Sequence, residues 1–178
     1  MGDISTYENV LEMFKQVNCS GEHNNIFVAV KDISKGARAN STIIGGAVGG
    51  MVGYTVGMIV GESIEARTNK IASCNSIYYL INQTEHGIAI LPLNGGSMLS
   101  SCANPEKLSP KFEEIMFFTY QELQDIEVKN FNMLNSRVQS VKITFADGKK
   151  IYFNVNVKEK FLPYQEECFA NFMKLYKK

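Results

Sequence analysis

The sequence predicts an α+β domain built on an antiparallel sheet or barrel, and three observations lead to this prediction. Apolar and polar residues alternate in several short segments between Ser76 and Val157, which is the spacing of half-buried strands. Asp147-Gly148 separates two of these segments and is typical of a tight hairpin turn. An amphipathic helix is predicted after Pro163, with glutamates in its first turn and lysines in its last.

The N-terminal part is expected to add a helix and a strand. Ser5-Thr-Tyr-Glu8 matches a capping box, and the apolar residues around and after it recur at helical spacing. These residues are Tyr7, Val10, Leu11, Phe14 and Val17. Alternation over residues 26–33 then predicts the first strand of the sheet.

The remaining strands follow a run of charged residues that ends near Lys70. They are expected over residues 77–81, 86–93, 115–118, 125–131, 141–145 and 151–157. Residues 94–111 contain Gly95-Gly96 and two prolines, and we expect them to form a long loop.

The stretch from Asn40 to Gly61 is uncharged and repeats glycine at every fourth position. Each of these glycines follows a β-branched residue, and they are Gly45, Gly49, Gly53, Gly57 and Gly61. A glycine costs an exposed helix about 1 kcal/mol relative to alanine, so a close helix–helix contact must offset the loss. We therefore predict a glycine-zipper helix over residues 40–66 that packs its glycine face against another helix.

Four segments resemble the bacterial pleckstrin-homology-like (PH-like) and GRAM-like domains. They are His86–Leu93, Phe118–Glu127, Val141–Lys150 and the helix Pro163–Tyr176. The resemblance covers residues 73–178 and implies a partly open antiparallel β-barrel of about seven strands with a C-terminal capping helix. The strand over residues 26–33 completes that count, so residues 1–178 are expected to form one domain that carries the zipper as an insertion.

The first strand also bears on where the zipper lies. If residues 26–33 pair with the later strands, both ends of the zipper lie on the same side of any membrane. A single crossing of about 20 residues puts its two ends on opposite sides. An insertion packed against protein is our first interpretation, and a membrane-inserted segment with a cytoplasmic PH-like domain is the alternative.

Charge and cysteine usage narrow the expected partners and compartment. The 178 residues include 18 basic and 18 acidic side chains, so no basic field favours nucleic acid. The four cysteines lack C-x-x-C spacing and are expected to be reduced and mostly buried, which fits a reducing compartment. The N-terminal sequence does not have a signal-peptide pattern. We expect a cytoplasmic protein, with peripheral or integral membrane association as the alternative.

Motifs for catalysis, metal binding or cofactor binding are not evident. His23 and His86 have no cysteine or carboxylate at ligand spacing, and both are expected to be ordinary loop histidines. The zipper glycines match neither the dinucleotide fingerprint nor a P-loop. We therefore predict a non-enzymatic protein without a metal or cofactor.

Basic residues around the last predicted hairpin form a candidate contact surface. They are Lys149, Lys150, Lys158 and Lys160, with Tyr152 among them. In PH-like folds a basic hairpin end can receive lipid headgroups, so the resemblance implies a lipid or partner contact here. A solvated hairpin end explains the same residues without any ligand.

These patterns lead to two functional hypotheses. In the first, the chain is an interaction module that binds a protein partner or self-associates through the zipper glycines. In the second, residues 41–61 insert into or associate with a membrane. An enzyme is the weakest interpretation, because it needs a constellation of polar residues that the linear sequence does not display.

Overall fold

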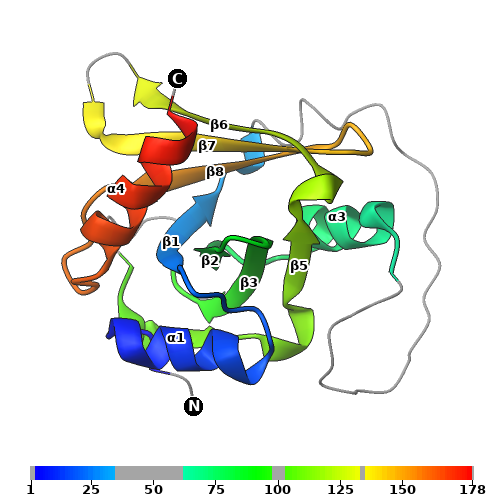
Figure 1. The fold of residues 1–178 in the computed structure, drawn as a ribbon. Coiled ribbons are helices and arrows are strands. Elements are labelled where there is room, and N and C mark those ends of the chain that lie inside the picture. Colours follow the sequence, from blue (N-terminus) through cyan, green and yellow to red (C-terminus); the bar gives the residue numbers. More distant parts are fainter. Residues whose placement is uncertain (1–2, 35–61, 98–102, 133–134, 178) are drawn as a thin grey trace.

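The computed structural model describes residues 3–34, 62–97, 103–132 and 135–177, and one antiparallel sheet organises them. The strand order is β4-β3-β2-β1-β8-β7-β6, and β5 pairs with β3 beyond this path (Figure 1). The strands are β1 (Asn25–Lys31), β2 (Tyr78–Gln83), β3 (Gly87–Gly95), β4 (Leu108–Pro110), β5 (Met116–Thr119), β6 (Leu123–Asn132), β7 (Asn135–Phe145) and β8 (Lys150–Asn156). The sheet is open, so the predicted α+β class and antiparallel sheet are confirmed and the structure is not a closed barrel.

Three α-helices pack around this sheet in the described chain. They are α1 (Tyr7–Gln16), α3 (Ile64–Ser73) and α4 (Gln165–Tyr176). The predicted N-terminal helix is present, but its N-cap is Thr6 and not Ser5: the side chain of Thr6 accepts a hydrogen bond from the Asn9 amide, one residue beyond the predicted Ser5–Glu8 capping box. The C-terminal helix is also confirmed, and Figure 1 shows it packed beside β1 on one side of the sheet.

Strand β1 lies in the middle of the sheet, between β2 and β8. Its residues from Asn25 to Val30 pair with β2, and Val30 and Lys31 pair with Asn154 and Phe153 of β8. The predicted first strand is therefore confirmed as part of the same sheet as the later ones. Consequently, the described chain leaves this sheet after β1 and returns to it through α3.

The two faces of the sheet bury separate apolar clusters. On the inner face, Phe169 and Phe172 of α4 contact Phe27 of β1, with ring centroids 5.0 and 4.8 Å apart. On the outer face, Phe14 of α1 packs with residues of β1–β3, including Leu80. Burial on both faces explains why β2 reads as a nearly continuous apolar run.

The hairpin of β7 and β8 agrees closely with its prediction. Val141 pairs with Phe153 and Ile143 pairs with Ile151, and all four side chains are buried. The turn places Gly148 at φ +82°, a left-handed conformation that glycine adopts without steric cost.

Two segments differ from expectation. Residues 94–111 are not one long loop, because β3 continues to Gly95, a 3-10 turn forms at Pro105–Lys107, and β4 pairs with β3. The predicted zipper helix over residues 40–66 lies mostly outside the described residues. The last residues of the predicted range are described. Ser63 has an extended backbone, and its side chain accepts a hydrogen bond from the Ala66 amide, so it is the N-cap of helix α3.

Helix α3 is held largely by polar side chains. Arg67 is buried, donates to the Phe117 carbonyl at the edge of β5 and forms an ion pair with Glu122. On the other side, Lys149 donates to Asn69 at 2.8 Å and Thr68 donates to Asp147 at 3.1 Å. Figure 1 shows α3 beside β5 and the turn between β7 and β8, where these contacts join it to the sheet.

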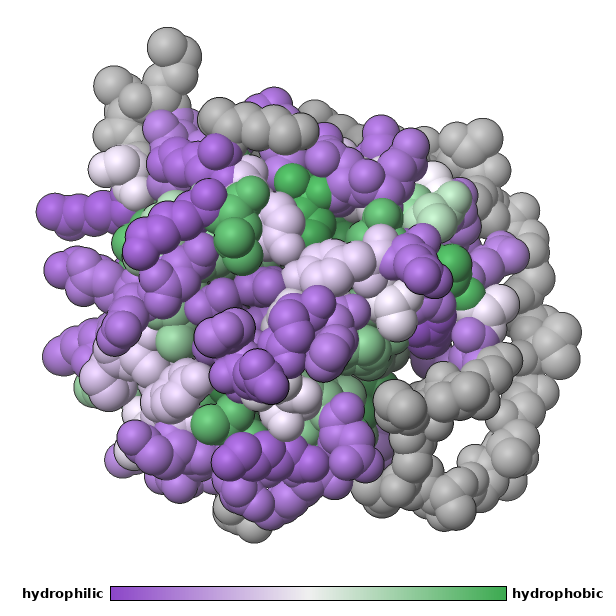
Figure 2. Space-filling view, viewed as in Figure 1, coloured by the Kyte–Doolittle hydropathy of each residue, from purple (hydrophilic) through white to green (hydrophobic). Residues whose placement is uncertain are grey.

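The surface and helix lengths of the described chain also bear on the sequence hypotheses. None of its helices is long and apolar enough to cross a membrane, and residues 35–61 are not among those described. On the face shown in Figure 2, hydrophilic residues dominate and apolar residues form separate small patches.

Candidate functional site

A pocket of about 350 Å³ lies where the described chain leaves β1. The end of β1, the connection from α3 to β2, and the start of β8 form its wall. The lining residues are Lys31, Asp32, Ile33, Ala72, Ser73, Cys74, Asn75, Ser76, Lys150, Ile151 and Tyr152. We call it the junction pocket, because Ser34, the last described residue before residues 35–61, follows directly on its lining residue Ile33.

Lys31 connects the end of β1 to the C-terminus of α3. Its Nζ donates to the carbonyl oxygens of Ile71 at 3.1 Å and Ala72 at 3.4 Å, and also to the carbonyl of Cys74. These carbonyls carry the partial negative charge of a helix end, which favours a cation. Burial lowers the pKa of Lys31 below its ordinary value. With three acceptors in contact, its ammonium group is already fully engaged.

Asp32 is a buried carboxylate on the wall of the pocket, only 8% exposed. Its two oxygens accept hydrogen bonds from Ser34 Oγ at 2.7 Å and Asn154 Nδ2 at 3.4 Å. Its backbone amide donates to the Tyr152 carbonyl at 2.8 Å and extends the pairing between β1 and β8. These contacts fix the chain direction as it leaves the sheet.

Cys74 and Ser76 provide the polar groups of the α3–β2 connection. The half-buried Cys74 thiol donates to Glu114 Oε2 at 3.1 Å, and Lys111 lies 3.4 Å from the other oxygen of Glu114. Ser76 is 6% exposed, and its buried Oγ finds no hydrogen-bond partner among the described residues. An unpaired buried hydroxyl is costly.

Two of the predicted contact residues, Lys150 and Tyr152, line the junction pocket. Lys149, the third predicted contact residue near this end of β8, contacts α3 instead. Only 12% of its side chain is exposed. In addition to Asn69, Lys149 lies 3.5 Å from Glu65 and 3.8 Å from Asp147. Its main contacts therefore attach α3 to the hairpin.

The other two predicted contact residues follow the opposite end of β8. Lys158 forms an ion pair with Glu166 at 2.9 Å, and Lys160 lies over the ring of Phe161 at 5.1 Å. The seven-residue strand β8 separates them from Lys150, so the five residues do not form one cluster. The predicted helix-packing residues Gly45, Gly49, Gly53, Gly57 and Gly61 all lie outside the described residues.

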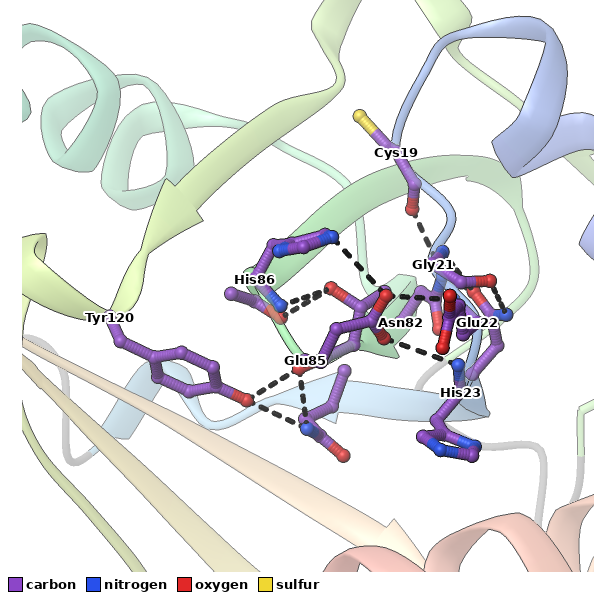
Figure 3. Close-up of polar contacts among 12 residues, drawn as sticks. Cys19, Gly21, Glu22, His23, Asn82, Glu85, His86 and Tyr120 are labelled. Atoms are coloured by element: carbon purple, nitrogen blue, oxygen red, sulfur yellow. Dashed lines mark hydrogen bonds and ion pairs between the residues drawn. The ribbon is translucent and has the colours of Figure 1, made fainter.

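Both histidines belong to a polar clamp between two loops, shown in Figure 3. The Glu85 carboxylate accepts hydrogen bonds from the amides of Glu22 at 2.7 Å and His23 at 3.2 Å, and His86 Nε2 lies 3.2 Å from it. The backbone hydrogen bond from Glu22 is the main cause that lowers the pKa of Glu85 to about 2. This arrangement joins the α1–β1 loop to the β2–β3 turn.

A second group in Figure 3 extends the clamp towards α4. Tyr120, labelled in Figure 3, donates to the Thr84 carbonyl at 2.6 Å and accepts from Gln83 at 2.7 Å. Its oxygen also lies 3.2 Å from the hydroxyl of Tyr176 in α4. Asn82, fully buried, donates to the Cys19 carbonyl at 3.0 Å. These side chains satisfy backbone groups at the end of the sheet. In the part of the chain that the structure describes, no cluster of metal-ligating side chains occurs.

The fold and the site define an α+β protein with an open antiparallel sheet and a pocket at the end of β1, lined by both apolar and charged residues. No protein-family model, curated protein or solved structure matches the chain. The interpretation of its function therefore rests on the chemistry and placement of its own residues.

Proposed function

We propose that this protein is a non-enzymatic interaction module of the cytoplasm that self-associates through its glycine zipper. In this proposal a PH-like frame carries residues 40–61 as an insertion, and the glycine faces of two copies pack against each other. The supporting observation is that both elements that flank residues 35–61, β1 and α3, are built into one sheet and its core.

The contacts of the flanking elements support an insertion with two fixed ends. Strand β1 pairs on both sides, and Lys31 at its end donates to the carbonyls of α3. Helix α3 is attached in turn through buried Arg67 and through Ile71, which lies in the inner core. Movement of either end of the insertion therefore requires these contacts to break.

The composition of the segment supports a helix as its partner. Glycines at every fourth position let two backbones approach closely, and van der Waals contacts and Cα–H···O interactions then replace the missing side chains. A second copy offers the same surface, and a two-fold axis lets identical faces pair with each other. For this reason self-association is the form of partner binding that we propose.

The same two fixed ends disfavour a single membrane crossing. A crossing helix spans about 30 Å of hydrocarbon and separates its ends across the bilayer. Strand β1 and helix α3 belong to one sheet and its core, which lies on one side of any membrane. The cytoplasmic placement is supported by Cys19, Cys74 and Cys168, which form no disulfide in the described part of the chain, because reducing conditions keep thiols free.

The test replaces glycines of the predicted contact face in the full chain. Gly49→Leu and Gly53→Leu block close helix approach, whereas Val52→Leu changes a neighbouring position off the glycine face. We expect size-exclusion chromatography with light scattering to give an oligomer for the wild type and Val52→Leu and a monomer for both glycine variants. A monomeric wild type, or unchanged mass in both glycine variants, contradicts the proposal. Co-sedimentation of the wild type with liposomes identifies the membrane alternative.

A further inference from the structure

The junction pocket has the size and lining of a small-molecule site. Its volume of about 350 Å³ lies within the range of ligand pockets, and its apolar wall includes Ile33, Ala72 and Ile151. Ile33 is 52% exposed and is one of the largest exposed apolar side chains described. An apolar group that enters the pocket therefore removes apolar surface from water.

Lys150 gives the wall of this pocket a positive charge. Among the described residues it has no ion-pair partner, whereas Lys149 and Lys158 are each held by a carboxylate at the distances given above. Lys150 is exposed and lines the pocket, so its ammonium group is available to a ligand.

The other charged groups around the pocket are already engaged. Lys31 donates to three carbonyls, and both oxygens of Asp32 accept hydrogen bonds from Ser34 and Asn154. Glu114, which accepts from Cys74, is paired with Lys111. Among the described residues that line the pocket, Lys150 is therefore the one cation whose side chain has no hydrogen-bond or ion-pair partner, and it lies beside an apolar wall.

Ser76 is a further polar residue of the pocket wall. Its Oγ is buried without a hydrogen-bond partner in the described part of the chain, so it is not counted among the groups that a ligand contacts.

We propose that the junction pocket binds a small amphipathic monocarboxylate. The apolar chain of the ligand lies against Ile33, Ala72 and Ile151, and its carboxylate pairs with Lys150. A phosphate group is a poorer match, because sites for dianions usually converge several cationic or amide donors, and the described wall of this pocket has one free ammonium group. This inference does not depend on self-association, so the two proposals can fail separately.

Cys74 provides a local reporter in the full-length protein. It lines the pocket and is half-buried, while Cys19 and Cys168 are buried in the core. The rate at which iodoacetamide alkylates Cys74 can be followed by mass spectrometry of its peptide. Octanoate is the probe, and octanol and octylamine are the matched neutral and cationic compounds.

We expect octanoate to slow the alkylation of Cys74 and the other two compounds to have little effect. Lys150→Gln should raise the octanoate concentration needed for protection roughly tenfold or more, the fold-change expected for a lost charged hydrogen bond. Lys158→Gln, which removes a lysine at the far end of β8, should leave protection unchanged. Thermal melting checks that both variants fold.

Three results overturn the proposal. They are equal protection by octanol and octanoate, protection by octanoate that survives Lys150→Gln, and no protection by any of the three compounds.

Discussion

Arg67 of α3 and Glu122 of the β5–β6 connection form an ion pair whose side chains are 8% and 25% exposed. The same guanidinium donates to the Phe117 carbonyl, and it lies 4.7 Å from the centroid of the Phe118 ring. Burial raises the pKa of Glu122, but hydrogen bonds from Arg67 and from the Thr119 amide outweigh it and lower the pKa overall. One side chain thus attaches helix α3, which follows residues 35–61 in the sequence, to the edge of β5.

Removal of Arg67 should destabilise the protein strongly. In Arg67→Met, the Phe117 carbonyl and the Glu122 carboxylate lose their partner in a mostly buried place, and we expect a loss of about 3 kcal/mol in the free energy of unfolding. Urea denaturation measures it. The control is Lys70→Met, because Lys70 pairs with Glu62 at an exposed position where a pair contributes at most about 1 kcal/mol.

The double variant Arg67→Met/Glu122→Gln separates loss of the pair from loss of packing. Glutamine keeps the capping contact with Thr119 but carries no charge, so it should recover about 1 kcal/mol. Equal stability of the Arg67 and Lys70 variants would show that α3 does not depend on this ion pair.

Gly87 and Gly148 both have positive φ but differ in the space around them, so they can be compared by the same substitution. A Cβ at Gly87, at φ +157°, would lie 2.1 Å from the Phe118 carbonyl oxygen of β5, whereas a Cβ at Gly148 meets no atom within 4 Å. Gly87→Ala should cost about 3 kcal/mol, because strand β5 has to move away from β3. Gly148→Ala should cost about 1 kcal/mol, the strain of the left-handed conformation alone. Similar midpoints of thermal unfolding for the two variants would contradict the close approach of β3 and β5.

Glu85 should contribute to a pH dependence of stability in acid. Its pKa in the folded state is about 2, below the ordinary value of 4.5, so the unfolded chain binds more protons between these values. The contribution is therefore complete above pH 4.5 and is lost as the pH falls towards 2. Glu85→Gln should flatten the stability curve in this window, as measured by urea midpoints at a series of pH values.

The exposed Glu12 of α1 supplies the control for this titration. Glu12→Gln should leave the acid dependence as in the wild type. The Glu85 variant should retain part of it, because Glu127, bound to Lys129 and Lys142, also has a pKa lowered to about 2. An unchanged curve in Glu85→Gln would show that the clamp of Figure 3 does not form in solution.

Elements whose own residues carry a clear apolar spacing could be predicted from the sequence. The β7–β8 hairpin follows from alternation around Asp147-Gly148, and β1 and α4 follow from their own apolar spacing. Helix α3 was not predicted separately, because few of its residues are apolar. Its main contacts come from Lys31, Glu122 and Lys149, which are distant in the sequence.

The candidate site was likewise predicted only in part from the sequence. Lys150 and Tyr152 were identified from the sequence as contact residues, but the pairing of β1 with β2 and β8 is what adds Lys31, Asp32 and Ser76. A lysine followed by an aspartate at the end of an apolar strand was the available signal, since charges in such a place usually have specific partners. The grouping of the five predicted contact residues could not be judged without knowing that β8 separates them.

We propose that residues 40–61 are an insertion with two anchored ends that provides the contact between copies. Replacing these residues with a glycine–serine linker of the same length tests it most directly, with mass and thermal unfolding measured on the same sample. We predict a monomer that unfolds cooperatively, because β1 and α3 keep their contacts in the sheet and core. A variant that fails to fold, or that keeps the wild-type oligomeric mass, would contradict the claim.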